Sequence, residues 1–297
     1  MSPDDDIPPN DIPPQDIPDD EHSARLLLKE MGQSEALLQP IGQAALALAI
    51  LEAPAAKLAT YDAHLARLGT DVRDMVGAGS ITHLPVEEVR SAIAHVIYGL
   101  HGYQGDHETY DDLQNANLIR VIDRRRGLPV ALGILVIAVA RGIGVEAVGL
   151  DFPGHFLVRI DCGGERCVID PFNGAKAMDA SELRRLLKAA LGAEAELETR
   201  HYEPALDKDV LLRLQNNLKL RLIQRQEVER AAEIVEAMLM IAPERAVLWR
   251  EAGLLNAHVG NLQTAILALE TYVQRETRDG PKREAAELLA ELQRKIN

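Results

Sequence analysis

An apolar run from Val130 to Ala140 constrains the fold of this chain more than any other feature. Its 11 residues carry no charge on any side of a helix, and they fall well short of the roughly 20 that a membrane-spanning helix needs. A helix that is apolar on every face lies in the interior of a protein. Gly127-Leu128-Pro129 before the run and Arg141-Gly142 after it are typical of a helix start and a helix end. The sequence therefore predicts a buried helix around which a domain packs.

Three short runs of β-branched and apolar residues follow this helix, at 145–150, 156–160 and 167–169. Glycines and prolines bound them, which is typical of strands. Gly163-Gly164 separates the last two runs and predicts a β-hairpin with a two-residue turn. A buried helix beside a small antiparallel sheet places the chain in the α+β class.

Helical patterns occupy the segment before this core, from His22 to about His101. Only 3% of the chain is aromatic and its apolar residues are mostly Ala and Leu, which favours helices packed on helices. The predicted helices run from Pro40 to about Ala53, from 55 to 68 after Pro54, from near Thr70, and from Leu84-Pro85 onward.

The C-terminal segment is helical again, and its spacing is typical of tetratricopeptide repeats of about 34 residues. We predict two helix pairs, at 212–245 and 246–279, and a capping helix at 281–296. The signature positions are held by Ala231, Pro243, Trp249, Gly253, Gly260 and Ala265. Two pairs are fewer than the roughly three that a free-standing array needs, so we expect this array to pack against the preceding domain.

Charge and cysteine content narrow the classes of function. Residues 1–21 repeat Asp-Ile-Pro three times, with eight acidic residues and no Lys or Arg, and predict a disordered solubilising tail or, alternatively, a docking motif. The net charge of −14 without a basic stripe argues against nucleic-acid binding. Neither a signal peptide nor a membrane helix is predicted, so we expect a cytoplasmic protein. Cys162 and Cys167 are too few for a disulfide scaffold or a zinc site.

These observations predict four segments: the tail at 1–21, an N-terminal helical region at 22–100, an α+β core at 101–204 and repeat-like helices at 205–297. We predict no cofactor and no metal.

The run from His101 to Glu108 holds two histidines and two acids, but its glycines favour a polar loop over a metal site. Arg124-Arg125-Arg126 is interpreted as pairing with carboxylates such as Asp111 and Asp112, with binding of an anionic partner as the alternative. The oligomeric state is left open.

The hairpin register brings two chemically active side chains together. With Gly163-Gly164 as the turn, Cys162 faces Glu165 and Leu157 faces Asp170. His155 and Asp170 are then diagonal neighbours on one face, at roughly 7–8 Å between backbones. A carboxylate at that distance can fix the tautomer of an imidazole and raise its pKa. The alternative is a buried pair that merely orders the hairpin.

Several motifs in this region, taken together, resemble the transglutaminase-like superfamily. More narrowly, the chain is similar to the bacterial branch with C-terminal tetratricopeptide repeats, which includes SirB-type invasion regulators. The motifs are Tyr110–Leu118, Val121–Arg126, Gly127-Leu128-Pro129, Gly142–Val145, Pro153–Val158 and Val168–Phe172. The resemblance covers the chain from about Leu84 to the C-terminus.

The resemblance implies a papain-like core in which a cysteine at the start of the central helix attacks an amide or peptide carbonyl. Histidine on one strand and aspartate on the next activate that thiol. His155 and Asp170 match these two positions. The family's spacing, counted back from Gly144, places the cysteine position at Pro129. Cys162 and Cys167 lie beyond His155, away from any helix start, and we interpret them as small, partly buried side chains.

The sequence thus predicts a catalytically silent transglutaminase-like domain that binds a protein or peptide partner and has a regulatory role. His155 and Asp170 would be a remnant pair whose nucleophile is missing at Pro129. The alternative is a cysteine-independent hydrolase or acyltransferase that uses His155 and Asp170. A third possibility makes the hairpin a purely structural core.

Overall fold

A computed structural model describes residues 20–34, 40–77, 79 and 81–296 of the 297-residue chain. Residues 1–19, which make up most of the predicted acidic tail, lie outside this described part. The first described helix, α1 (Asp20–Gln33), starts within the last two residues of that predicted tail.

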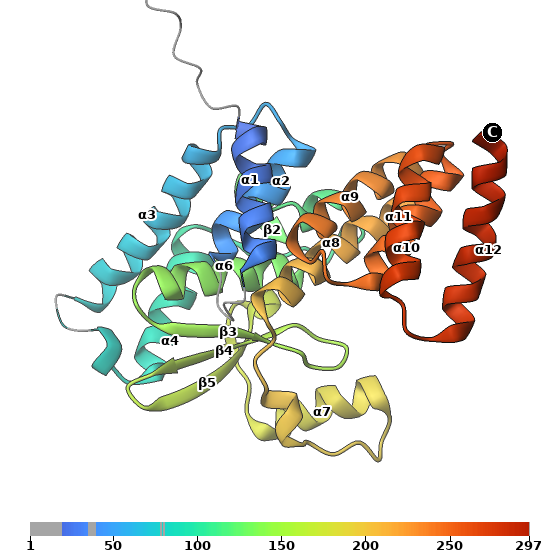
Figure 1. The fold of residues 1–297 in the computed structure, drawn as a ribbon. Helices are drawn as coiled ribbons and strands as arrows, with labels where there is room; N and C mark the ends of the chain where they lie inside the picture. The colour runs from blue at the N-terminus through green and yellow to red at the C-terminus, as the bar shows by residue number, and fades with distance from the viewer. Residues whose placement is uncertain (1–19, 35–39, 78, 80, 297) are drawn as a thin grey trace, which may run out of the picture.

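The predicted central helix is confirmed as α6 (Pro129–Gly142). Pro129 occupies its first turn, where the missing amide hydrogen costs nothing, and nearly every later side chain is buried. Helices α2 (Ile41–Glu52) and α3 (Leu58–Val76) pack on one side of α6, and the sheet packs on another (Figure 1). This surrounded position explains why the run could be apolar on every face.

The sheet has four antiparallel strands in the order β3-β4-β5-β6, namely β3 (Glu146–Leu150), β4 (Leu157–Cys162), β5 (Glu165–Asp170) and β6 (Lys176–Ala177). The α+β prediction and the hairpin register, with Cys162 opposite Glu165, are both confirmed. Gly163 and Gly164 have φ values of 59° and 79°, which two-residue hairpin turns require and only glycine adopts easily.

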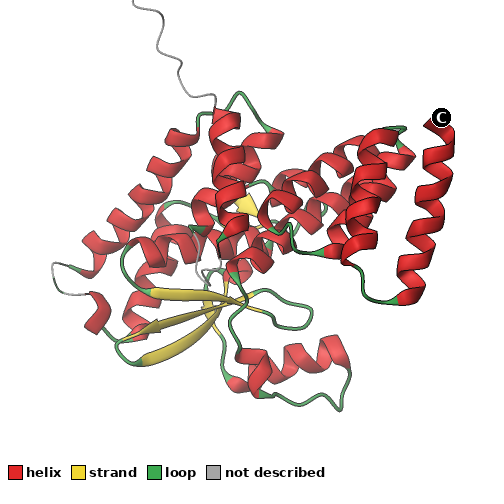
Figure 2. Ribbon diagram, viewed as in Figure 1, coloured by secondary structure: helices red, strands yellow, loops and turns green. Residues whose placement is uncertain are grey.

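The two faces of the sheet pack against different helices. Phe156, Val158 and Ile160 form a buried row with α6. Leu157 on the opposite face packs with Leu183 and Leu187 of α7 (Ala180–Leu191), which lies below the sheet in Figure 2. The side-chain alternation of β4 therefore serves two separate apolar clusters.

Two predicted helix boundaries in the N-terminal region are wrong. The chain does not start a new helix at Pro54 or near Thr70; after a turn, α3 runs unbroken from Leu58 to Val76. Leu65, Leu68, Gly69 and Val72 are buried at helical spacing, so one apolar stripe continues through position 70. The predicted helix after Leu84-Pro85 is present as α4 (Val86–Ala94).

The remaining elements of this region connect the N-terminal helices to α6. They are η1 (Ile81–His83), the π-helical η2 (His95–Leu100), η3 (Leu113–Ala116), α5 (Leu118–Arg124) and a parallel two-stranded pair, β1 (Gln104–Gly105) with β2 (Arg126–Gly127). Two further 3-10 turns lie later in the described chain: η4 (Pro171–Asn173) between β5 and β6, and η5 (Thr199–Tyr202) after α7.

Five helices make up the rest of the described residues: α8 (Asp207–Gln224), α9 (Val228–Ile241), α10 (Ala246–His258), α11 (Leu262–Arg275) and α12 (Asp279–Ile296). Neighbours in this series pack in pairs, and α12 covers the outer end (Figure 1). As expected, the array packs on the rest of the protein, because α9 contacts α1 and α8 contacts α6.

A buried ion pair joins the array to the core. Arg141, in the last turn of α6, donates hydrogen bonds of 2.6 and 3.0 Å to the two carboxylate oxygens of Asp207, in the first turn of α8. The Asp207 side chain has no exposed surface. Arg141 also donates to the backbone oxygen of Ala147 on β3.

None of the helices in the described ranges combines the length and the apolar composition that crossing a membrane requires.

Candidate functional site

His155, Asp170 and Pro129 line one cavity of about 240 Å³, which we call the His155 cleft. It lies where the start of α6, the end of β5 and the turn before β4 meet one face of α8. Its lining residues are Tyr110, Leu128, Pro129, Val130, Gly154, His155, Phe156, Asp170, Phe172, Asn173, Arg213 and Asn217. Three residues that the sequence singled out are therefore brought to one place.

His155 lies in the turn before β4, since the ladder ends at Leu157. Gly154 has a φ of 73° and allows this turn. The next residue, Phe156, seats its ring on α6 at Gly133, where a Cβ atom would stand 2.2 Å from the ring carbon Cε1. The Nδ1 atom of His155 is buried and has no hydrogen-bond partner. The turn at Gly154 and the packing of Phe156 thus fix the backbone of His155, while the Nδ1 atom of its ring makes no hydrogen bond.

Asp170 is 5% exposed and accepts its hydrogen bonds from its own turn. Its Oδ1 accepts from the backbone nitrogens of Phe172 (2.9 Å) and Asn173 (3.3 Å), and its Oδ2 accepts from Nδ2 of Asn173 (2.7 Å). The carboxylate therefore caps η4 in this structure. The carboxylate–imidazole interaction expected from the sequence stays a prediction.

The start of α6 offers no nucleophile, because Pro129 carries neither a thiol nor a hydroxyl. The two cysteines lie elsewhere: Cys162 is buried with its Sγ 3.2 Å from the backbone oxygen of Ile81, and half-buried Cys167 is on β5. Neither lines the His155 cleft. Burial raises the pKa of both thiols, which keeps them protonated and weakly nucleophilic.

Helix α8 supplies a wall of the cleft that the sequence reasoning missed. Arg213 donates a 3.1 Å hydrogen bond to the backbone oxygen of His155, and Asn217 lies one turn further along the same face. Arg221 pairs with Asp111 at 3.1 Å, and Arg225 donates to the backbone oxygen of Asp111. In the sequence, polar residues recur every fourth position from Arg213 to Arg225, and residues at this spacing share one face of a helix. This pattern was the available signal that α8 presents a polar face.

The loop at 106–112, which we call the Tyr110 loop, packs against α8 at the edge of the cleft. His107 and Tyr110 pack on the ring of Phe172, with centroid distances of 4.4 and 5.9 Å. Burial raises the pKa of the Asp106 carboxyl, but hydrogen bonds from Thr109 and its neighbours prevail and lower it to about 2. Asp106 thus stays charged and organises the loop.

The arginine run before α6 pairs with carboxylates in part as expected. Arg124 contacts Asp106 at 3.3 Å and Asp112 at 3.7 Å, whereas Asp111 pairs with Arg221 instead. Within the described ranges, no cluster of three or more His, Cys, Asp or Glu side chains is placed to hold a metal ion.

A second polar cluster lies outside the cleft, between α3 and β1. The Nε2 atom of His64 lies 2.8 Å from the Tyr103 hydroxyl and 2.7 Å from an Nη1 of Arg125. His101 pairs with Asp71 at 2.7 Å, and its ring stands 5.7 Å from that of His64. Burial, followed by the Arg125 charge, lowers the pKa of His64 to about 4. Neutral His64 therefore accepts from Arg125, whereas a protonated ring would face a second cation.

This cluster predicts a loss of stability in mild acid. His64 has a pKa near 6.5 in the unfolded chain and about 4 in the folded protein. The stabilisation of the fold by neutral His64 is therefore fully present above pH 6.5, and it declines as the pH falls toward 4. Because His64 is partly exposed and solvent weakens the effect, we expect the free energy of unfolding to fall by about 1–2 kcal/mol between pH 6.5 and pH 4. Urea unfolding of the wild type and His64→Asn at pH 7 and pH 4.5 measures it. Equal losses in the two proteins would contradict this origin.

Comparisons with known proteins agree with the motifs. The family model described as transglutaminase-like superfamily matches residues 59–216, and a tetratricopeptide repeat model matches residues 218–293. Similar proteins include a UPF0162 protein of Xylella fastidiosa strain Temecula1, 34% identical over 187 residues, which are 62% of this chain and 66% of that protein. The matched region thus spans just under two thirds of that relative.

Two further relatives are more distant. The UPF0162 protein YchA of Escherichia coli K12 is 29% identical over 192 residues, covering 64% of this chain and 71% of that protein. Protein SirB1 of Salmonella typhimurium is 28% identical over 189 residues, covering 63% and 70%. Among solved structures, a menin structure described as revealing the binding site for Mixed Lineage Leukemia protein has a TM-score of 0.42 at 12% identity, covering 87% of this chain and 71% of that chain. Such a low TM-score supports no conclusion about this chain.

Proposed function

Since the chain belongs to the transglutaminase-like superfamily, we propose that it is a catalytically silent member whose His155 cleft binds a protein or peptide partner. In this proposal it acts in the cytoplasm as a regulatory module. The repeat-like helices, through α8, contribute directly to the binding surface.

The observation that carries the proposal is Pro129 at the start of α6. Thiol-dependent acyl transfer needs a sulfur at that point, where the helix terminus and a nearby imidazolium stabilise the thiolate. Proline supplies no such atom, and the two cysteines lie outside the cleft lining. The cleft itself persists, with polar groups from four separate parts of the chain around it. A site that keeps its shape and lacks its nucleophile is suited to binding.

Tetratricopeptide repeats support the same reading, because stacked helix pairs commonly bind peptide segments. Here the array is represented at the cleft by Arg213 and Asn217 of α8. A partner segment in the cleft would therefore contact the helix in which the two family matches meet. This arrangement supports a single binding surface over two independent ones.

The alternative function is a hydrolase or acyltransferase in which His155 activates water and Asp170 supports it. The uncommitted, buried Nδ1 of His155 favours this alternative, because a general base needs a free nitrogen. The engagement of Asp170 in its own turn does not favour it.

An electrophilic glutamine-amide probe and a plain glutamine-amide substrate together separate the two functions, because the probe labels a reactive side chain and the substrate reports hydrolysis by activated water. We expect neither labelling nor substrate turnover in a Cys162→Ser/Cys167→Ser double variant, in which background reaction with thiols is removed. Mass spectrometry of the intact protein and of the substrate measures the two outcomes. Labelling or turnover that survives in this variant and disappears when His155→Ala is added would overturn the silent assignment.

Partner binding is tested with the full chain and His155→Ala. A partner recovered from the native cell should bind the variant at least about 10-fold more weakly, as expected for a central contact in a binding site. The melting temperature should stay close to that of the wild type, since His155 makes no side-chain hydrogen bond through Nδ1. A variant that loses stability and keeps its affinity would instead support a purely structural hairpin. The exposed His22 of α1 gives a matched control, His22→Ala.

A further inference from the structure

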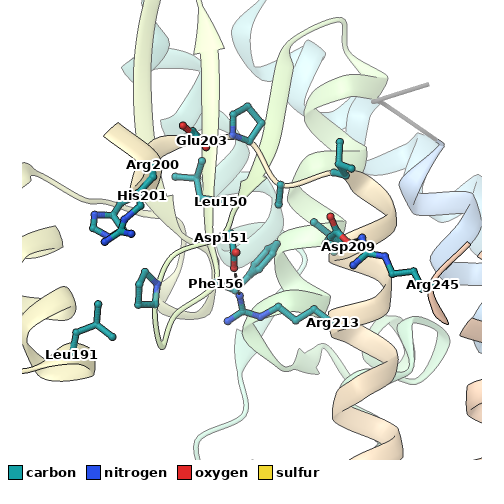
Figure 3. Close-up of a pocket in the computed structure, with 15 residues that line it drawn as sticks. Leu150, Asp151, Phe156, Leu191, Arg200, His201, Glu203, Asp209, Arg213 and Arg245 are labelled. Atoms are coloured by element: carbon teal, nitrogen blue, oxygen red, sulfur yellow. Dashed lines mark hydrogen bonds and ion pairs between the residues drawn. The ribbon is translucent and has the colours of Figure 1, made fainter. Parts of the chain in front are cut away.

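Arg213 stands between the His155 cleft and a second, larger cavity. This larger cavity has a volume of about 770 Å³ and lies between the turn before β4, the 200–206 segment and α8 (Figure 3). Arg213 and Phe156 line both cavities. The guanidinium lies over the Phe156 ring, 5.5 Å from its centroid. A ligand that extends from one cavity to the other must therefore pass Arg213.

The charge of Arg213 has little compensation inside the protein. The side chain is 36% exposed, and of its five N–H groups one donates a hydrogen bond within the described part of the chain, to the neutral backbone oxygen of His155. Its carboxylate neighbour, Asp151, is 3.8 Å away and 89% exposed. Such a loose, solvated pair contributes little. Burial disfavours the charged form of Arg213 and lowers its pKa.

Other arginines of the core and of the larger cavity have closer carboxylate partners. Arg141 has both oxygens of buried Asp207, and Arg124 has two carboxylates. In the larger cavity, Arg245 pairs with Asp209, and Arg200 pairs with Glu198 at 3.0 Å. Arg213 therefore differs from its neighbours in holding a partly buried charge that faces open volume.

The acid of the cleft does not fill this role. Asp170 is committed to three donors in its own turn, and no ion pair joins it to Arg213 in the described residues. An incoming group that carries a negative charge would meet the guanidinium without a competing internal partner other than Asp151. Planar, bidentate recognition of carboxylates is what arginine does best in proteins.

We propose that Arg213 anchors a carboxylate of the peptide partner at the junction of the two cavities. The proposal rests on the proposed binding function and names the chemistry of the ligand. The small cavity, of about 240 Å³, has room for a side chain or a chain end. The larger cavity has the size of an ordinary ligand pocket and holds the adjoining residues. The carboxylate comes from an acidic side chain or from a chain terminus.

Short peptides test this chemistry on the full-length protein. One pair is an acetylated, amidated pentapeptide with Glu at its centre and the same peptide with Gln. The second pair is an acetylated Ala tripeptide with a free or an amidated C-terminus. Titration of the ¹⁵N-labelled protein at pH 7, up to about 10 mM peptide, gives each dissociation constant. We expect one carboxylate peptide to bind about 10-fold more tightly than its neutral counterpart, and the pair that shows this preference identifies the source.

Two variants assign the preference to Arg213. In Arg213→Gln the carboxylate preference should disappear, whereas in Arg200→Gln, a matched change in the larger cavity only, it should persist. Because Arg213→Gln also removes the bond to His155, Asp151→Asn provides an independent measurement. Loss of this competing, exposed acid should tighten carboxylate binding by about 2- to 5-fold.

The proposal fails if no carboxylate peptide binds better than its neutral counterpart, or if the preference survives in Arg213→Gln. Failure of the peptide experiment together with lost partner binding in His155→Ala would leave the cleft as the binding site and reject the carboxylate. Carboxylate binding at Arg213 with unchanged partner binding in His155→Ala would reject the proposed function and leave an anion site.

Discussion

Replacing Arg141 with methionine is expected to lower the free energy of unfolding by about 3–5 kcal/mol, the usual result of removing one member of a buried ion pair. Methionine keeps most of the apolar stem, so the loss reports the missing guanidinium. The fully buried carboxylate of Asp207 would then lack the two hydrogen bonds that Arg141 donates. Urea denaturation followed by circular dichroism measures the change.

Two controls make this prediction specific. Lys295→Met removes the exposed pair with Glu291, one helical turn away on α12, and should leave stability unchanged within error. Arg141→Met combined with Asp207→Leu should recover much of the loss, since apolar residues often replace a buried pair at little cost. A single variant as stable as the wild type would show that α8 is held against α6 by other contacts.

Replacing Gly32 with alanine is expected to cost about 1–3 kcal/mol through overpacking. Gly32 lies near the end of α1, where that helix meets α9. A Cβ atom there would stand 2.1 Å from the backbone oxygen of Met240. Because this neighbour is backbone, the helices themselves must separate. The same shift would strain the hydrogen bond from Nζ of Lys208 to the Gly32 oxygen.

Gly142→Ala is the matched control for Gly32→Ala. Gly142 is also in the last turn of a helix, α6, but it is exposed and a Cβ atom there meets nothing within 4 Å. This change should be neutral or stabilising by up to about 1 kcal/mol, because alanine favours helices. Thermal unfolding of the two variants checks both expectations. Equal effects would show that helix propensity, and not the α1–α9 approach, controls stability at these positions.

The centre of the fold was predictable because its signals are local. The apolar run of α6 specified a buried helix, and Gly163-Gly164 specified a hairpin whose register is confirmed. The boundary near Thr70 was not predictable from local cues, because the residue that continues the helix, Gly69, is normally a helix breaker. The helix passes close to Ile143 there, 74 residues away in the chain, and a Cβ atom on Gly69 would lie 3.4 Å from it, in ordinary contact.

The candidate site was predictable only in the part that the hairpin builds. The hairpin register and the predicted start of α6 placed His155, Asp170 and Pro129 in one region. In the structure all three line one cavity. The commitment of Asp170 to its own turn follows from Asp-Pro-Phe-Asn, a sequence suited to capping a short 3-10 turn. The contribution of Arg213 was predictable only in part, because the four-residue spacing defines a helix face but does not show that this face contacts His155, 58 residues away.

The place of α8 bears on how this protein can be dissected. The two family matches meet at residues 216 and 218, inside α8, so the junction between them falls between Arg213 and Arg221. A fragment that stops before α8 would keep the imidazole and the carboxylate and lose the side of the hollow that Arg213 and Asn217 provide. It would also lose the arginines that tie down Asp111. The boundary between the two family matches thus lies inside one continuous helix, and cutting the chain there would remove a structural element that both parts share.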